Sequence, residues 1–169
     1  MYLSHWELER SPFRMAVDPA AAYPSAALDE ATARIEYLVS ERRRAGVLLG
    51  ERGLGKSVAL AAAAHALRKR GARATVVDAI GLAPRELVTR VASDLGAGVD
   101  PADDTPRLWR RIEDLLAHHR WLGRETVLLV DDLGQAGADT VRQLVRLARL
   151  DPSPDARWTI IAAAEPTQL

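Results

Sequence analysis

The sequence predicts an α/β domain, with helices on both faces of a parallel sheet, because two residue patterns alternate along it. Short apolar runs at residues 47–49, 74–78, 126–132 and 157–164 have the length and composition of strands. Longer segments between these runs carry apolar residues at helical spacing. Strands that alternate with helices are typical of a parallel sheet with right-handed crossovers. We therefore expect a three-layer fold around four parallel strands.

A phosphate-binding P-loop is predicted by the pattern G-x-x-x-x-G-K-[ST], which the chain matches at Gly50-Glu51-Arg52-Gly53-Leu54-Gly55-Lys56-Ser57. The motif requires a strand before the loop and a helix after it, and the flanking residues 47–49 and 58–70 fit both. A chance match in a glycine-containing turn is the disfavoured alternative. Glycines let the backbone wrap a phosphate closely, and the new helix N-terminus attracts the anion. Lys56 would contact the β- and γ-phosphates, and Ser57 would coordinate Mg²⁺.

The first predicted helix, residues 26–44, has Ser25 as its predicted N-cap. Tyr23 precedes it, and two interpretations of this residue stay open: ordinary packing, which spacing alone favours, and the edge of a nucleotide base pocket. The predicted cofactor-binding residues are Tyr23, Gly50, Glu51, Arg52, Gly53, Leu54, Gly55, Lys56, Ser57 and Val58.

Two carboxylates end the apolar run at residues 126–132. In an open parallel sheet, ligands bind at the C-terminal ends of the strands. Asp131 is therefore predicted as the Walker B aspartate that holds Mg²⁺, with a solvated pair of acids as the alternative. Asp132 and Lys56 are the predicted catalytic residues, and Asp132 would polarise the attacking water. Many such ATPases have a longer glutamate at this place, so we expect slow hydrolysis.

Further helices are predicted at residues 84–95, after a cap at Thr105, and at residues 138–150. Gly46 is predicted to end the first helix. Residues 41–44 are predicted as a solvated, charged helix end, with nucleic-acid contact as the alternative. His118 and His119 point in different directions on a helix, so we predict surface residues and not metal ligands.

Composition excludes some functions and leaves others open. Lys plus Arg equals Asp plus Glu at 23 each, so net charge favours neither nucleic acid nor an anionic membrane. The lack of cysteine excludes disulfides and thiol chemistry. No apolar run approaches the roughly 20 residues that span a bilayer, and no signal peptide is recognised. We expect a cytoplasmic protein.

Residues 1–24 form a segment of their own in the sequence, punctuated by Pro12 and Pro19. Several large apolar groups predict that it packs on the core, residues 25–169, because a disordered tail rarely carries so many. These groups are Tyr2, Leu3, Trp6, Leu8 and Phe13.

Several of these features together resemble the ExeA-like AAA+ ATPases, the general secretion pathway protein A group. The similar phrases are Met1-Tyr2-Leu3-Ser4, Ser11-Pro12-Phe13 and Tyr23-Pro24-Ser25. The P-loop and residues 127–132 fall in the family's order and spacing. DNA-binding AAA+ transposition ATPases share most of these features. The resemblance implies ATP as the nucleotide, a homo-oligomer that remodels a partner complex, and a parallel sheet in the order 5-1-4-3-2.

The resemblance also implies a polar sensor at the end of the fourth strand, where Glu165 stands. The family commonly has an amide there, and a carboxylate would repel a γ-phosphate. The fifth strand, arginine finger and helical lid would follow, so we expect a truncated core with sheet order 1-4-3-2 and an exposed first strand. An arginine finger contributes about 10³–10⁵ in rate, so hydrolysis by this chain alone should be weak.

The sequence thus predicts Mg·ATP binding, and ATP hydrolysis by a full-length oligomer that remodels a partner complex. An alternative is a nucleotide-dependent DNA-binding regulator with incidental hydrolysis. Its contacts would be Arg42, Arg43 and Arg44 and the arginines within residues 138–150. A further alternative is a degenerate interaction module that does not hydrolyse ATP. Asp132 and Glu165 leave this alternative open, because both differ from the residues that are usual at these positions.

Overall fold

A parallel sheet runs through the centre of the molecule in the computed structural model, which describes residues 5–7, 17 and 22–168. The strands are β1 (Ala45–Leu49), β2 (Arg73–Asp78), β3 (Thr126–Asp131) and β4 (Trp158–Ala164). They lie in the order β1-β4-β3-β2, and every neighbouring pair is parallel. The predicted fold class and strand order are both confirmed.

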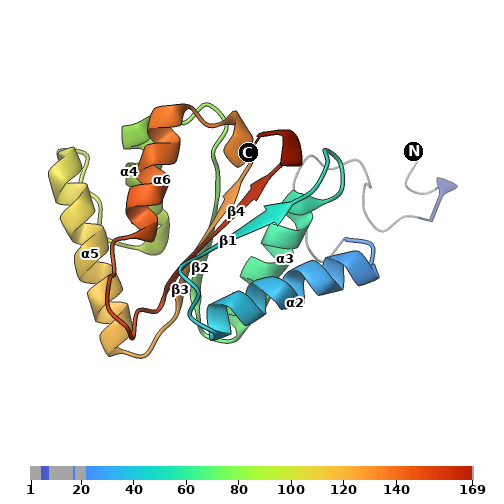
Figure 1. The fold of residues 1–169 in the computed structure, drawn as a ribbon, viewed down its shortest axis with the longest axis horizontal. Coiled ribbons are helices and arrows are strands. Elements are labelled where there is room, and N and C mark those ends of the chain that lie inside the picture. Colours follow the sequence, from blue (N-terminus) through green and yellow to red (C-terminus); the bar gives the residue numbers. More distant parts are fainter. Residues whose placement is uncertain (1–4, 8–16, 18–21, 169) are drawn as a thin grey trace.

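Helices cover both faces of this sheet, which gives the three predicted layers (Figure 1). One layer contains α2 (Ala26–Ser40) and α3 (Lys56–Lys69). The other contains α4 (Pro84–Leu95), α5 (Thr105–Trp121) and α6 (Ala138–Ala148). Two short 3₁₀ turns, η2 (Leu133–Gln135) and η3 (Pro166–Gln168), follow β3 and β4.

The strand register brings the carboxyl ends of the strands to one edge of the sheet. Asp78 at the end of β2 pairs with Asp131 at the end of β3. Leu49 at the end of β1 pairs with Ala164 at the end of β4. The segments that follow these residues therefore start side by side, and they include the predicted P-loop and Glu165.

Each face of the sheet has its own hydrophobic core. On the α2–α3 side, Leu60 and Leu67 pack with Leu129 of the central strand. On the other side, Leu87 and Ile112 pack with Leu128. Fully burying a side chain of this size contributes about 1.5–3 kcal/mol. These two cores fix the sheet, and with it the loops at its carboxyl edge.

Two predicted helix starts have clear capping geometry. The Ser25 hydroxyl accepts a hydrogen bond from the Leu28 N–H at 3.2 Å, which confirms Ser25 as the N-cap of α2. The cap of α5 is Asp104, whose carboxylate accepts from the Arg107 N–H at 2.9 Å. The prediction of Thr105 is therefore off by one residue, because the carboxylate one step earlier reaches the free amide.

The end of α2 differs from the prediction. The helix stops at Ser40, not at residue 44, and Arg42 adopts a left-handed φ of 53°. Gly46 does not end the helix but lies inside β1. A Cβ on Gly46 would come within 2.6 Å of Leu38 Cδ1 and 2.8 Å of Ile161 Cδ1. A side chain at this position would therefore push aside the ends of Leu38 on α2 and Ile161 on β4, which pack closely over the glycine.

The two neighbouring histidines have different surroundings. His118 is exposed as predicted, but the prediction for His119 is wrong, since its side chain is buried. The Nδ1 atom of His119 lies 2.8 Å from Thr126 Oγ1, within hydrogen-bond distance, because the end of α5 packs on the start of β3. Burial lowers the pKa of His119, and the nearby Arg124 charge lowers it further.

Helix α6 is shorter than predicted. It ends at Ala148, two residues before the predicted end at residue 150. Leu144 and Leu147 are buried, whereas Val145 is 48% exposed. The indole Nε1 of Trp158 donates to the Leu147 carbonyl at 2.7 Å, which ties α6 to β4.

Strand β1 is an edge strand, as predicted, because among the described strands it pairs with β4 alone. It is not buried on both faces: Val47 is 54% and Leu49 50% exposed. An apolar edge of this kind can pair with another chain.

The N-terminal segment stays largely outside the described residues. Of the apolar groups that predicted its packing, Tyr2, Leu3, Leu8 and Phe13 lie outside them, and Trp6 is exposed. The packing of residues 1–24 therefore stays a prediction. Among the described helices, none has the length and apolar character to cross a bilayer.

Candidate functional site

The glycine-rich loop connects the end of β1 to the start of α3, as the motif requires. Gly53 and Gly55 have φ angles of 83° and 81°, a region that residues with a side chain rarely adopt. No atom lies within 4 Å of a Cβ built on either glycine. These glycines are therefore required by the backbone conformation and not by a lack of space.

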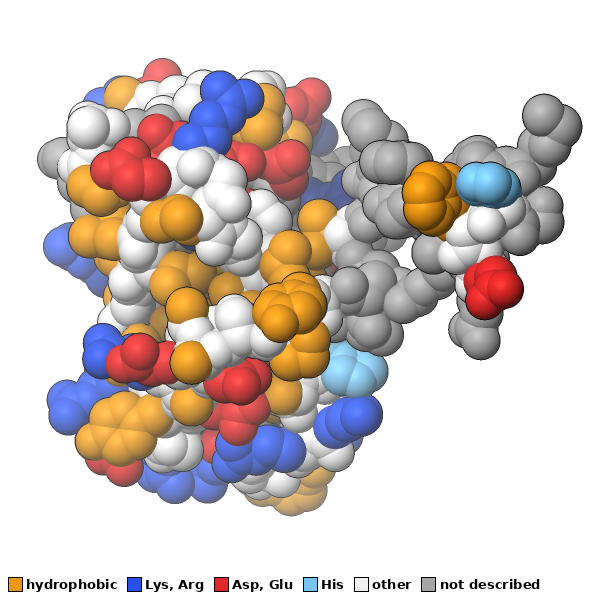
Figure 2. Space-filling model, turned by 90° about the vertical axis from the view of Figure 1, so that its right-hand side faces the viewer, with side chains coloured by type: hydrophobic (Ala, Val, Ile, Leu, Met, Phe, Trp, Pro, Cys, Tyr) orange, Lys and Arg blue, Asp and Glu red, His pale blue; other side chains and the backbone are white. Residues whose placement is uncertain are grey.

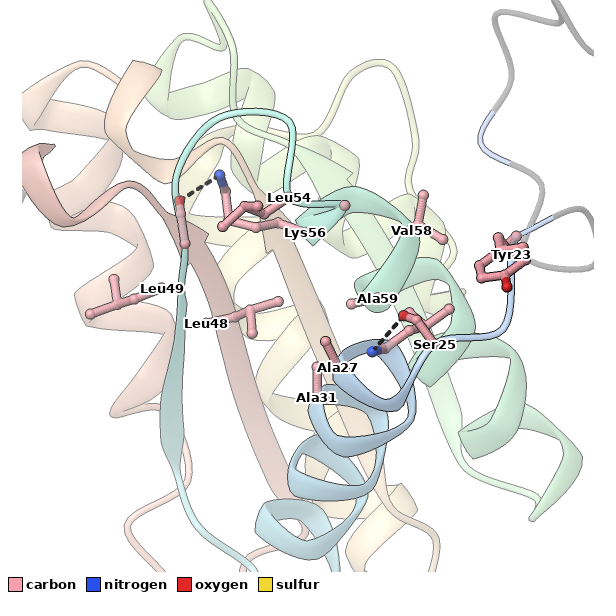
Figure 3. Close-up of a pocket in the computed structure, with 14 residues that line it drawn as sticks. Tyr23, Ser25, Ala27, Ala31, Leu48, Leu49, Leu54, Lys56, Val58 and Ala59 are labelled. Carbon is pink, nitrogen blue, oxygen red and sulfur yellow. Dashed lines mark hydrogen bonds between the residues drawn. The ribbon is translucent and has the colours of Figure 1, made fainter.

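Lys56 is the first residue of α3, and its side chain folds back over the loop (Figure 3). The ammonium donates hydrogen bonds to the carbonyl oxygens of Gly50 at 2.8 Å and Glu51 at 3.0 Å. These bonds hold a positive charge at the start of the loop. Ser57 follows directly and is half-buried.

The N-terminus of α3 is open to an anion. Its N-cap is Gly55, so no side chain caps the first amides of this 14-residue helix. Uncapped N–H groups and the helix dipole together attract negative charge. Because Lys56 stands at the same point, two independent sources of positive potential coincide there.

A first cavity of about 390 Å³ lies between the start of α2, the end of β1 and the start of α3. Figure 3 shows Leu48 pointing from β1 toward this space, while Leu49 points to the opposite side of the strand. Ala27, Ala31 and Ala59 leave room for a flat group. Tyr23 lines the entrance and is 87% exposed.

The surface on the α2–α3 side of the molecule is mainly apolar at the centre of this face. Figure 2 views the α2–α3 side and shows hydrophobic side chains in the middle of the face. Acidic and basic side chains lie above and below them, intermixed. Leu54 of the loop, at 72% exposure, is among the exposed apolar residues of the chain.

A second cavity of about 510 Å³ lies on the other side of the loop. It shares Gly55, Lys56 and Val58 with the first cavity, so the two meet at the start of α3. Its polar character comes from side chains of three segments that are far apart in sequence. These side chains are Arg52, Lys56, Ser57, Asp132, Gln135 and Glu165.

The two acids at the end of β3 have distinct geometries. Asp131 is buried, and its Oδ1 accepts the Asp132 N–H at 3.0 Å. Asp132 has a left-handed φ of 49°, which is uncommon outside glycine but tolerated by aspartate. This turn of the backbone lets Asp132 line the second cavity while Asp131 stays at the strand end.

Negative charge gathers at this edge of the sheet. Burial raises the pKa of Asp132 above its ordinary value, and the neighbouring charges of Asp131 and Asp78 raise it further. Glu165 acts in the same direction, whereas Lys56 opposes it. Carboxylates that raise one another's pKa are stabilised by a bound cation.

The two predicted Mg²⁺ ligands are placed differently, since Ser57 lines the second cavity whereas Asp131 is not among its lining residues. Asp131 offers a carboxylate and Ser57 a hydroxyl, and Mg²⁺ takes one or two such ligands and completes its shell with water and phosphate oxygens. Within the described part of the chain, no group of three or more Asp, Glu, His or Cys residues is arranged to hold a metal by itself. A site of this kind depends on the nucleotide for its remaining ligands.

Sequence reasoning missed three residues that help to build the site. Asp78 ends β2 beside Asp131, and its Oδ1 accepts the Ile80 N–H at 2.9 Å. Its position at a strand end was a usable signal. Ile80 and Gln135 line the second cavity but carry no pattern that a sequence reveals.

The sheet order and the loop between β1 and α3 define the class of P-loop α/β domains. The chain belongs to the AAA domain family, whose profile matches residues 29–164. A comparison with curated protein sequences found no significant match.

Two solved structures resemble the fold. Cdc6p from Pyrobaculum aerophilum has a TM-score of 0.64 and 17% identity, over 94% of this chain and 45% of that one. The ORC2 protein of Aeropyrum pernix, solved as ADPNP-ADP complexes, has a TM-score of 0.60 and 16% identity, over 88% of this chain and 44% of that one. At these identities the likeness shows the fold alone. The chain spans less than half the length of either protein.

Proposed function

We propose that the chain binds Mg·ATP at the P-loop and hydrolyses it as part of a full-length oligomer. The observation that carries this proposal is the position of Lys56. Its ammonium is held over the loop by two carbonyl oxygens, at the point where the apolar cavity meets the polar one. An apolar space for a base and a cationic space for phosphates, joined end to end, match the shape and charge of a nucleotide.

The first cavity would take the base. Its walls are mainly alanine, leucine and valine side chains, which suit a flat apolar ring. Tyr23 lines its entrance, which supports the base-edge interpretation over packing, since an 87% exposed ring contributes little to a core. ATP as the preferred nucleotide rests on the family resemblance.

In the second cavity, Lys56 and the amides at the start of α3 would hold the phosphates. Ser57 and Asp131 would hold Mg²⁺, whose charge offsets that of the phosphate oxygens during transfer. Asp131 is suited to this role because a backbone bond to Asp132 fixes one of its oxygens. Asp132 would accept a proton from the attacking water.

Glu165 is the proposed sensor, by its place after β4 and in the second cavity. Its carboxylate adds to the negative charge around Asp132 and would repel a γ-phosphate. This supports weak hydrolysis by the chain alone.

Energy from hydrolysis would remodel a partner complex, as the ExeA-like resemblance implies. The phrases Met1–Ser4 and Ser11–Phe13 that carry this resemblance lie outside the described residues. The partner class, the oligomer and a cytoplasmic location stay predictions. The DNA-binding alternative also stays a prediction: its six arginines are all exposed, and three of them, Arg44, Arg142 and Arg146, also contact other residues of the chain.

Thermal unfolding tests the proposal. ATP at a hundred times its Kd stabilises a folded protein by about 2.7 kcal/mol, which is about 5–10 °C in Tm for a chain of this size. We expect this shift in the parent, and a further rise when Mg²⁺ is added with ATP. Ser57→Ala should lose the Mg²⁺ increment, while Ser93→Ala on the exposed face of α4 should keep it. If ATP does not raise the Tm of the folded parent, the proposal is overturned.

A further inference from the structure

Gln135 lines the second cavity and has no role in the proposed function. It ends η2, the 3₁₀ turn that starts directly after Asp132. Its side chain is exposed, so it is available to a ligand in this cavity. It shares the cavity wall with Lys56, Ser57 and Glu165.

The turn holds Gln135 in a defined position. The Gln135 N–H donates to the Asp132 carbonyl at 2.9 Å, and the Ala136 N–H donates to the Leu133 carbonyl at 3.0 Å. Leu133 and Ala136, on either side of the glutamine, pack on the core of the α4–α6 face. The backbone of Gln135 is therefore anchored beside Asp132, and only its side chain is free to adapt.

The chemistry of Gln135 differs from that of its neighbours in the cavity. Asp132 and Glu165 are carboxylates, which repel a phosphate oxygen when ionised. Arg52 and Lys56 are cations, which can bind the α-, β- or γ-phosphate of a nucleotide without distinguishing between them. A side-chain amide is neutral and carries two N–H donors, so it can bind a phosphate oxygen without adding charge.

We propose that Gln135 recognises the terminal phosphate of ATP and so distinguishes ATP from ADP. This inference rests on the proposed ATP-binding function. The amide donates to a γ-phosphate oxygen at the end of the cavity bordered by Asp132 and Glu165. It supplies the neutral donor that the carboxylate of Glu165 does not provide. The anchored turn connects this contact to Asp132, so that the base is aligned when a γ-phosphate is present.

The test compares two affinities in each variant: that for ADP and that for the non-hydrolysable β,γ-imido analogue of ATP, both with Mg²⁺. In Gln135→Ala, the Kd of the imido analogue should rise about tenfold or more, as expected for one lost hydrogen bond to a charged group. The Kd of ADP should change by less than about twofold. Gln135→Glu should weaken binding of the imido analogue at least as much, because it adds a carboxylate.

Gln143→Ala on α6 is the matched control, because Gln143 is not among the residues of either cavity. It should keep the parent's ratio of the two affinities. If Gln135→Ala keeps the parent's ratio of the two affinities, whether both are unchanged or both fall equally, the inference is overturned while the proposed function stays intact. If the folded parent binds neither nucleotide, the proposed function fails and the inference fails with it.

Discussion

The backbone N–H of Asp132 donates a hydrogen bond of 3.0 Å to Oδ1 of Asp131, the residue immediately before it. The bond accompanies a left-handed φ of 49° at Asp132. It gives two adjacent carboxylates different surroundings: Asp131 stays buried at the strand end, while Asp132 lines the second cavity. This difference supports the separate roles that we propose for the two acids, one as a metal ligand and the other as a base.

Replacing Asp132 by asparagine should therefore abolish hydrolysis without abolishing binding. The amide cannot accept the proton of the attacking water, and loss of a general base costs about 10²–10⁴ in rate. A single-turnover assay with protein in excess over ATP measures this rate even when the parent is slow. Asp139→Asn on the exposed start of α6 is the control and should hydrolyse at the parent's rate. Equal rates in Asp132→Asn and the parent would remove Asp132 as the base.

Gly46→Ser should destabilise the fold, because its Cβ would lie 2.6 Å from Leu38 Cδ1 and 2.8 Å from Ile161 Cδ1. Overpacking costs about 1–3 kcal/mol, and we expect the lower end of this range because both contacted atoms are side-chain ends, although Ile161 is buried. Gly137→Ser adds the same atoms where no other atom lies within 4 Å, at the N-cap of α6, and should be neutral or stabilising. Denaturant unfolding of both variants measures the difference. Equal stabilities would mean that α2 and β4 do not press on β1 as described.

Acid should destabilise the protein through His119. Its pKa is lowered in the folded state, first by burial and then by the charges of Arg124, His118 and Arg73. The unfolded chain then binds a proton more readily, so stability is fully present above the ordinary histidine pKa of about 6.5 and falls as pH drops below it. Thermal melts between about pH 5 and 8 follow this loss.

His119→Gln keeps a neutral side chain that can hydrogen-bond, and it should flatten this pH dependence. His118→Gln, at the exposed neighbouring position, should flatten it much less, because it removes only one of the smaller contributions to the lowered pKa of His119. A pH profile that His119→Gln does not change would show that other groups cause the loss of stability in acid.

Much of the fold was predictable from local patterns. The P-loop motif and the apolar run that ends at Asp131 are each a continuous stretch of sequence. Each therefore predicted a strand and a position at the carboxyl edge of the sheet. The strand order came with the family resemblance. Ser25 was recognisable as a cap because capping involves residues only three positions apart.

The remaining features depend on contacts between distant segments. Gly46 looks like a helix terminator, and only the approach of Leu38 and Ile161 shows why it lies in a strand. His119 is buried because Thr126 of β3 lies against it. Gln135 has no pattern of its own, and its place in the cavity follows from the turn after Asp132. Spacing along a chain cannot reveal any of these contacts.

The central claim is that Lys56 and its loop form a Mg·ATP site, and titration calorimetry tests it most directly. The folded parent should bind Mg·ATP, and Lys56→Ala should raise the Kd by about tenfold to a hundredfold through loss of a charged hydrogen-bond donor. Lys69→Ala, an exposed lysine at the other end of the same helix, should bind like the parent. A circular dichroism melt would verify that each variant is folded. Equal affinity of the parent and Lys56→Ala for Mg·ATP, or no binding by the folded parent, would contradict the account.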